Sequence, residues 1–403
     1  MRYFITFFPI FLLLTNCSQE RRTPQNKTFS AQKAKQAMAL CALQYEGLAK
    51  QLSPGQFPRS FEKGKMITSD KFWWCSGFYP GTMWYLYEAT KNEKWRDLAT
   101  EKTLELDLVK NQTGHHDLGF MLFCSYGNGF KITKDEKFLE PLTTGAYTLA
   151  RRFNPNVGAV KSWDWDGRRG WKYPVIIDNM MNLELLTWVG GREGQSSSLL
   201  KIANEHAQTT IKNHFRDDYS SYHVIDYNAE DGSVLHKNTA QGLNDESSWA
   251  RGQAWGLYGY TMMYRYTKNP IYLEQAQHIA GFILSNPNYP ADGVPYWDFE
   301  DPKIPHAYRD ASAGAIMASA LIDLSKLTKD EVLGKKYFDQ VETILNTLSG
   351  PEYLAKVGEN GHFLLKHSVG NLPRNSEVDT PLSYADYYYV EALVRYLANE
   401  NEV

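Results

Sequence analysis

A single acid between two apolar segments is the strongest candidate for chemistry in this sequence. Asp178 follows the apolar run 175–177 and precedes a segment with helical spacing of apolar residues that extends to Trp188. Burial between such segments should raise the pKa of the carboxyl group and keep it protonated. A protonated and well-positioned carboxyl can act as a general acid. An Asp at this position could equally cap the helix, and the local sequence leaves both interpretations open.

A second acid stands at another predicted helix start. The stretch Gly-His-His-Asp-Leu-Gly-Phe at 114–120 contains Asp117, and paired carboxylates suit the chemistry of glycosidic bonds. The alternative is a capping Asp flanked by solvated histidines. No histidine pair with i, i+4 spacing and no Cys-x-x-Cys motif accompanies it, so we expect neither a metal nor another cofactor.

The stretch Ser-Ser-Trp-Ala-Arg-Gly-Gln-Ala-Trp-Gly at 247–256 suggests a binding site for an acidic sugar. Arg251 can hold a carboxylate through two parallel hydrogen bonds, and Trp249 and Trp255 can stack on a sugar ring. The small Ala and Gly residues between them would let a ligand approach the backbone. The alternative is a buried aromatic helix in which Arg251 forms a structural ion pair.

Composition sets limits on the class of protein. The chain has 403 residues, 43% of them hydrophobic, which is enough for a large core in one or two domains. A formal net charge of -3 and the lack of a basic run argue against a nucleic-acid partner. The high load of 26 Tyr and 11 Trp is compatible with carbohydrate binding.

The N-terminal segment predicts export. Residues 1–17 combine a positive start with an apolar stretch, which is typical of a signal peptide. Their last four residues, Leu-Thr-Asn-Cys, resemble a bacterial lipobox, although Asn is unusual before the Cys. We expect a periplasmic protein that is attached to the membrane only through lipid on Cys17, with plain cleavage as the alternative. Residues 18–30 then form a tether, and residues 31–403 form the catalytic domain.

Helical periodicity predicts an all-α fold. Short polar turns separate the predicted helices, as at Thr90-Lys-Asn-Glu-Lys-Trp. They alternate with longer links, which would all lie at one end of a bundle of antiparallel helices. The arrangement favours a closed (α/α)6 double toroid over an open helical solenoid that binds protein, because aromatic and polar residues converge in the longer links. The predicted helices span 32–51, 77–90, 94–110, 117–129, 136–152, 178–193, 196–214, 251–267, 271–285, 309–327, 331–349 and 383–398.

Five motifs together resemble the unsaturated glucuronyl hydrolases of glycoside hydrolase family 88. The resemblance implies an (α/α)6 barrel and a metal-free hydrolase. It further implies as substrate an unsaturated uronyl di- or oligosaccharide, which polysaccharide lyases leave with a Δ4,5-unsaturated uronic acid at the non-reducing end. The motifs are WWCSGFYPG (73–81), HHDLGF (115–120), IIDNMMNL (176–183), SSWARGQAWG (247–256) and YADYYYVEAL (384–393).

The resemblance also assigns site residues. It implies Asp178 as the proton donor and Asp117 as its partner carboxylate. The match departs in the loop 366–380, where relatives that prefer sulfated substrates carry Ser and Lys contacts and this chain has Arg374 and Ser376. The implied substrate-binding residues are Trp74, Phe78, His116, Trp163, His223, Gln241, Trp249, Arg251, Trp255 and His367.

Two other functions remain open. One is an unsaturated rhamnogalacturonyl hydrolase of the related family 105, which would act on pectin fragments. The other is a non-catalytic glycan-binding lipoprotein of the cell surface, which would need aromatic residues but no buried acid.

Overall fold

The computed structural model describes residues 29–164 and 169–400, together with Met1. The predicted signal peptide and nearly all of the predicted tether lie outside these residues, so both remain predictions. Helix α1 (Ala31–Ala49) begins after Ser30, whose side chain accepts a hydrogen bond from the backbone N–H of Lys33. No helix in the described part of the chain is long and apolar enough to cross a membrane.

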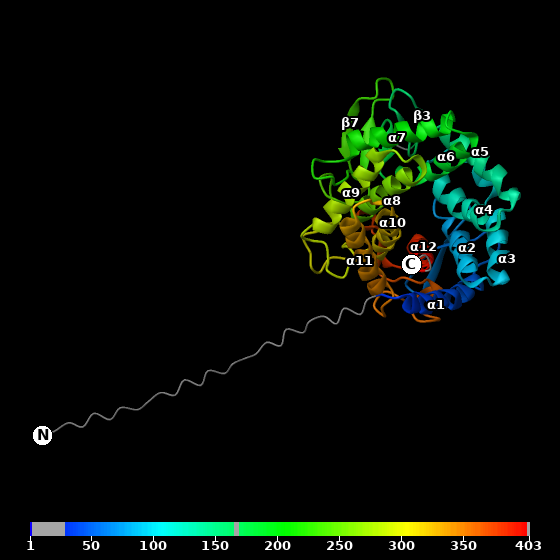
Figure 1. Ribbon diagram of the computed structural model, residues 1–403, viewed down its shortest axis with the longest axis vertical. Coiled ribbons are helices and arrows are strands. Elements are labelled where there is room, and N and C mark those ends of the chain that lie inside the picture. The colour runs from blue at the N-terminus through cyan, green and yellow to red at the C-terminus, as the bar shows by residue number, and fades with distance from the viewer. Residues whose placement is uncertain (2–28, 165–168, 401–403) are drawn as a thin grey trace.

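The helices form two concentric rings, as the helix pattern predicted (Figure 1). Each inner segment packs against the next, and the last packs against the first, so the inner ring is closed. The inner segments are α2 (Phe78–Thr90), the π-helix η2 (Gly119–Gly127) with α4 (Asn128–Thr133), α6 (Asn179–Glu193), α8 (Ala250–Thr267), α10 (Ala311–Leu327) and α12 (Ser383–Glu400). The outer helices are α1, α3 (Glu93–Leu104), α5 (Leu139–Ala150), α7 (Ser198–His214), α9 (Pro270–Ser285) and α11 (Glu331–Leu348). The prediction of an (α/α)6 barrel is confirmed.

Three of the twelve predicted helices are not α-helical throughout. The segment predicted at 94–110 is α-helical only to Leu104 and ends in a 3-10 turn, η1 (Asp107–Asn111). The segment predicted at 117–129 is mostly a π-helix, which sequence periodicity does not distinguish from an α-helix. A short 3-10 turn, η3 (Glu136–Phe138), precedes α5.

The recurring Thr-Lys-Asn/Asp turns join inner helices to outer ones. In the first, Lys91 ends α2 in the left-handed conformation at φ 55°. The side chain of Asn92 then caps α3 by accepting a hydrogen bond from the N–H of Lys94 at 3.1 Å. The turns at Lys134 and Lys268 repeat this geometry. Each motif therefore ends one helix and begins the next.

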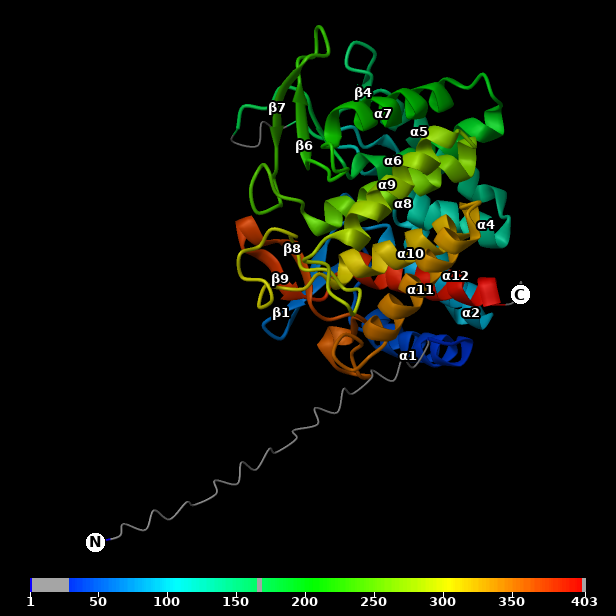
Figure 2. The same cartoon turned by 60° about the vertical axis from the view of Figure 1, so that its left-hand side comes forward.

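The longer links carry strands that the sequence pattern did not predict. They lead from outer to inner helices, and Figure 2 shows strands β1 and β6 to β9 gathered at one end of the barrel. Two 3-10 turns, η4 (Asn360–His362) and η5 (Leu372–Arg374), lie in the last of these links. The antiparallel pairs are β1 (Phe57–Glu62) with β2 (Lys65–Ser69), β3 (Phe153–Asn154) with β4 (Ala159–Val160), and β8 (Ser368–Asn371) with β9 (Ser376–Thr380). A three-stranded sheet joins β5 (Pro174–Ile176), β6 (Val224–Tyr227) and β7 (Val234–Asn238).

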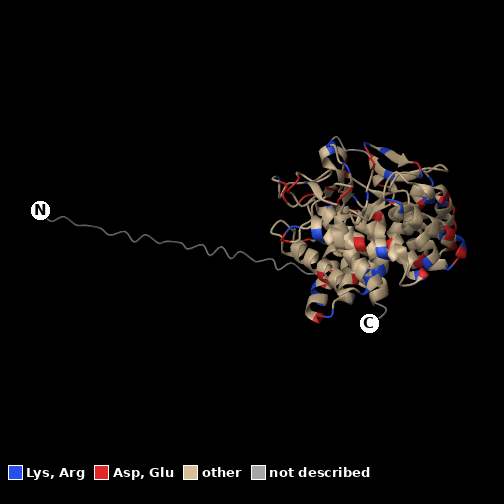
Figure 3. Cartoon of the chain, turned by 90° about the horizontal axis from the view of Figure 1, so that it is seen from above, with Lys and Arg blue, Asp and Glu red and all other residues tan. Residues whose placement is uncertain are grey.

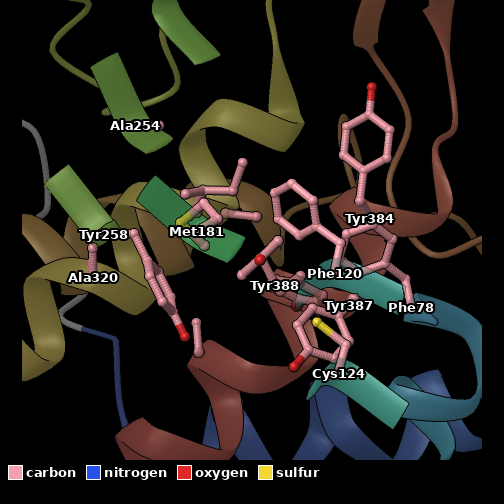
Figure 4. Close-up of a cluster of buried hydrophobic side chains, with 14 of the residues drawn as sticks. Phe78, Phe120, Cys124, Met181, Ala254, Tyr258, Ala320, Tyr384, Tyr387 and Tyr388 are labelled. Atoms are coloured by element: carbon pink, nitrogen blue, oxygen red, sulfur yellow. The ribbon is translucent and has the colours of Figure 1, made fainter. Parts of the chain in front are cut away.

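Aromatic side chains fill the inside of the inner ring. Phe78, Phe120, Tyr387 and Tyr388 are buried and lie together in Figure 4. The hydroxyl of the neighbouring Tyr384 points away from the cluster. On the face drawn in Figure 3, acidic and basic residues are intermixed, without a field of one sign. The aromatic cluster provides a rigid floor for the strand-bearing end of the barrel.

Candidate active site

A cavity of about 290 Å³ opens at the end of the barrel where the longer links gather. Its size lies near the lower limit of small-molecule sites and suits one or two sugar rings. A larger cavity of about 720 Å³ lies where α6, α7 and α8 meet near Trp188 and Tyr266, but no carboxylate of the described residues lines it. The smaller cavity is lined by Arg59, Trp73, Trp74, His116, Asp117, Phe120, Trp163, Ile176, Asp178, Gln241, Arg251, Gly370, Asn371, Arg374, Ser376, Glu377 and Tyr384.

Asp178 stands between β5 and α6, where both elements fix its position. It occupies the N-cap position of α6, yet its side chain makes no capping hydrogen bond. The capping interpretation is therefore wrong, and the carboxyl group points into the cavity instead. Pairing of Ile176 with Val224 holds the preceding strand, and Ile177 donates a backbone hydrogen bond to His223 at 3.1 Å.

The surroundings of Asp178 favour its neutral form. Burial raises the pKa of Asp178 to about 7; the charge of Arg251 opposes this rise, and the charge of Asp117 adds to it. The Oδ2 atom is buried without a hydrogen-bond partner among the described residues. The indole N–H of Trp255 lies close enough to favour the charged form, but it makes no hydrogen bond of normal geometry either. Asp178 therefore keeps its proton at a pH below about 7.

Asp117 is held in the opposite charge state. Burial works to raise its pKa, but the neighbouring histidines and Asn182 outweigh burial and lower the pKa below its usual value. The Nδ1 atom of His115 lies 3.2 Å from Asp117 Oδ2, and the Nε2 atom of His116 lies 3.3 Å from Oδ1. Asn182, one helical turn beyond Asp178, donates to Oδ1 at 3.5 Å. Asp178 and Asp117 thus stand in opposite charge states within one cavity.

The π-helix brings Asp117 against α6. Gly119 has no side chain, and a Cβ atom there would lie 2.4 Å from the Cα atom of Asn182. The side-chain oxygen of Asn182 accepts a hydrogen bond from the N–H of Phe120 at 2.9 Å, which satisfies a donor at the helix start. Any larger residue at 119 would separate the two helices that carry the acids.

His223 lies behind Asp178 as a neutral imidazole. Burial lowers the pKa of His223 to about 3. Its Nδ1 atom accepts hydrogen bonds from the backbone N–H groups of Ala240 and Gln241 at 3.0 and 3.2 Å. The proton therefore sits on Nε2, which is 3.7 Å from Asp178 Oδ2.

Arg251 does not present a free guanidinium to a substrate carboxylate, as the sequence suggested that it would. Its Nη1 atom contacts Asp310 at 3.1 Å and also donates to the carbonyl oxygen of Val369. Its Nη2 atom donates to the carbonyl oxygen of Gly370 at 2.6 Å. Arg251 lines the cavity and lies 4.4 Å from the Trp249 ring centroid, but its fork is occupied by these internal acceptors. The structure thus supports the alternative interpretation, a structural ion pair, over a free clamp for a substrate carboxylate.

Not all of the predicted binding residues reach the cavity. Trp74, His116, Trp163, Gln241 and Arg251 line it together with both acids, whereas Phe78, His223, Trp249, Trp255 and His367 do not. Phe78 and Trp255 are fully buried in the aromatic floor, and Trp249 packs with Trp297 and Val369. His367 lies further away, with its Nδ1 atom 2.6 Å from Asp379 Oδ1. These five residues do not line the cavity, and their part in substrate binding stays a prediction.

Sequence reasoning missed several residues of the cavity wall. Arg59 comes from strand β1 and Glu377 from strand β9, neither of which was predicted. Trp73, Phe120 and Tyr384 belong to the recognised motifs but were not assigned to the site. Phe120 and Tyr384 carried a usable signal, because the motif of each stands at the start of a predicted inner helix.

A metal-binding group is not evident in the residues that the structure describes. Among residues 29–164 and 169–400, no three His, Cys, Asp or Glu side chains are placed to hold a metal ion. Independence from metals and other cofactors remains a prediction.

Comparison with known proteins identifies close relatives over nearly the whole chain. The sequence profile described as Glycosyl Hydrolase Family 88 matches residues 51–398. An unsaturated glucuronyl hydrolase from Formosa agariphila is 42% identical over 399 residues, which cover 98% of this chain and 97% of the relative. An unsaturated glucuronyl hydrolase from a Bacillus species is 34% identical, with coverages of 84% and 90%. The crystal structure of an unsaturated glucuronyl hydrolase specific for heparin superposes with a TM-score of 0.89 at 50% identity, covering 93% of this chain and 99% of that one.

Proposed function

The chain belongs to glycosyl hydrolase family 88, and we propose that it releases Δ4,5-unsaturated uronic acid from the non-reducing end of glycosaminoglycan fragments made by lyases. The observation that carries this proposal is the pairing of a buried neutral carboxyl, Asp178, with an ionised one, Asp117, in a single cavity of sugar size.

The reaction is a hydration of the enol ether formed by C4, C5 and the ring oxygen. Asp178 gives its proton to C4, and the positive charge that develops at C5 is shared with the ring oxygen. Water adds to C5, and the Asp178 carboxylate accepts a proton from that water, which restores the acid. The resulting hemiketal opens and releases the aglycone sugar. Proton transfer of this kind contributes about 10²–10⁴-fold to a rate.

Asp117 and the neighbouring histidines set the conditions for that transfer. The Asp117 carboxylate accepts hydrogen bonds from sugar hydroxyls, and its charge opposes ionisation of Asp178. Burial lowers the pKa of His116 to about 4, so this residue is neutral near pH 7. The neutral His223 likewise leaves the proton on Asp178.

The test is a direct assay on lyase-generated disaccharides. The C4=C5 double bond absorbs ultraviolet light, and its hydration removes that absorbance. We expect rapid loss of absorbance with disaccharides derived from heparin or chondroitin, and little loss with unsaturated rhamnogalacturonan fragments. The reverse order would favour the pectin-directed alternative. Binding without any loss of absorbance would favour a glycan-binding lipoprotein.

The location of the enzyme is a separate proposal, supported by the sequence of residues 1–17. The protein is exported, and lipid on Cys17 holds it at the membrane of the periplasm. Radiolabelled palmitate should label the wild type but not a Cys17→Ala variant. Label in neither protein, with both found in the soluble periplasmic fraction, would indicate plain cleavage.

A further inference from the structure

The rim of the cavity carries an arginine and a tryptophan that the hydration step does not use. Arg59 extends from β1, and Trp73 precedes α2. The guanidinium carbon of Arg59 lies 4.2 Å from the centroid of the Trp73 ring. Although Trp is usually among the well-buried residues, Trp73 is 41% exposed. An exposed indole stacked with a guanidinium offers a ligand both a flat apolar face and a positive charge.

Exposure increases from the acid to this rim. The Asp178 and His116 side chains are 13% and 2% exposed, whereas the Arg59 side chain is 22% exposed. The unsaturated ring must lie at Asp178, because C4 has to receive its proton there. The next sugar of the substrate therefore extends toward the exposed rim, where Arg59 and Trp73 lie.

Arg59 forms an ion pair with Glu377 but keeps donors that the described residues do not use. Of the three arginines that line the cavity, Arg251 has both terminal nitrogens occupied by protein acceptors. Arg59 uses only Nη2, which contacts Glu377 at 2.8 Å. Its Nε atom is buried without a hydrogen-bond partner, and its Nη1 atom has none within the described part of the chain. A buried donor without an acceptor costs free energy, which an anionic group of a ligand could offset.

The backbone that carries Arg59 is held firmly in place. Ser60 forms a bridge with Leu382, which directly precedes α12. The hydroxyl of Thr380 donates to the carbonyl oxygen of Phe61 at 3.0 Å. The first hairpin is thus attached to the last one, although more than half of the chain separates them. A fixed backbone lowers the entropic cost of binding a ligand at this rim.

We propose that Arg59 and Trp73 form a subsite for the sugar that follows the unsaturated uronyl residue. Trp73 stacks on that sugar, and Arg59 binds a sulfate group on it. This inference rests on the proposed function, and it gives the N-terminal hairpin a part in the recognition of sulfated substrates.

The test compares Arg59→Gln with wild type on a sulfated disaccharide and its unsulfated counterpart. We expect kcat/KM for the sulfated substrate to fall about tenfold, the equivalent of one charge-assisted hydrogen bond, mainly through KM. The value for the unsulfated substrate should fall much less, so that the ratio of the two values changes. Arg96→Gln is the matched control, because Arg96 is also paired with a Glu but lies on the exposed surface of α3.

A second variant separates binding from a purely structural role. Glu377→Gln removes the counter-charge while Arg59 stays, so KM for the sulfated disaccharide should fall. If both variants instead lose activity alike on both substrates, with lower melting temperatures, the ion pair is only structural and the subsite is refuted. An equal loss on both substrates in Arg59→Gln alone would place Arg59 at the uronyl ring and also refute it. A wild type that hydrates neither disaccharide would overturn the proposed function itself.

Discussion

At the scale of single residues, the site depends on two carboxyl groups in opposite charge states. Asp178 is kept neutral mainly by burial, whereas Asp117 is kept ionised by histidine and asparagine contacts that outweigh burial. The two effects reinforce each other, because the charge of Asp117 disfavours a second charge on Asp178. A neutral acid and an anionic partner are what enol ether hydration requires.

Asp178→Asn should lose at least about 10²-fold in kcat, because an amide cannot supply the proton. The fold should remain intact. In the folded wild type the pKa of Asp178 is raised to about 7, whereas in the unfolded chain it has its ordinary value of 3.8. Between these two pH values only the folded state keeps the proton. The stability of the wild type therefore falls as pH rises from 3.8 to about 7. Asp178→Asn cannot lose a proton at this position, so its stability does not decline in this way. Its melting temperature above pH 7 should be no lower than that of wild type. Asp231→Asn, in an exposed loop, is the control, and substantial residual activity in Asp178→Asn would place the donor elsewhere.

The pH profile provides a second check on the same pair. Because the acid must be protonated, kcat/KM should fall as pH rises through about 7. Asp117→Asn removes a charge that raises the pKa of Asp178, so the descending limb should move to lower pH, in addition to a loss of rate. The measurement is kcat/KM across the pH range for both proteins. If the descending limb does not move, the charge of Asp117 does not affect the pKa of Asp178.

At the scale of elements, Arg251 connects three parts of the barrel. From the first turn of α8 it reaches Asp310, the N-cap of α10, and the carbonyl oxygens of Val369 and Gly370 in β8. Asp310 and Arg251 are both almost completely buried. The guanidinium fork therefore holds the wall of the cavity in place.

Arg251→Lys should consequently destabilise the protein, because one ammonium cannot serve these acceptors together. We expect a loss on the order of 2–4 kcal/mol in the free energy of unfolding. Activity should fall equally for acid and methyl-ester substrates, since the fork is already occupied in the free enzyme. The measurements are denaturant unfolding and kcat/KM for both substrates. If the advantage of the acid over the ester disappears in the variant, Arg251 binds the substrate carboxylate after all, as the sequence suggested.

At the scale of the whole molecule, the site lies at one end of the inner ring. A network of charged and polar side chains connects the inner helices further along the ring. Glu391 accepts hydrogen bonds from Tyr85, Ser319 and Arg395 at 2.7, 2.6 and 2.9 Å. Arg395 also contacts Asp323, which pairs with a second arginine of α8. These contacts join α2, α8, α10 and α12 across the ring.

Glu391→Gln should test whether this network serves stability alone. Removing one charge from a buried group of this kind should cost about 3 kcal/mol in the free energy of unfolding. The kcat of the folded enzyme should not change, because Glu391 lies about 10 Å along α12 from the cavity residue Tyr384. Glu46→Gln, in an exposed ion pair with Lys94, should change stability by less than about 1 kcal/mol. A large fall in kcat at unchanged stability would instead couple the network to the site.

The sequence by itself determined the features that depend on near neighbours along the chain. The twelve helical periods, the Thr-Lys-Asn/Asp turns and the longer links follow from spacing and capping chemistry. Asp178 and Asp117 were identifiable because each stands at a helix start within a recognisable motif. Strands inside the longer links were missed, because they are short and are stabilised by partners in distant segments.

Only the tertiary structure decided which side chains face the substrate cavity. Arg59 meets Glu377 because the first and last hairpins lie side by side where the ring closes, and no local pattern encodes a contact between residues so far apart. The sequence also identified Arg251 as a guanidinium between two indoles, but it could not show where the fork points. Asp310, Val369 and Gly370 take its hydrogen bonds because a buried arginine requires acceptors, and the closing of the ring places those three around it.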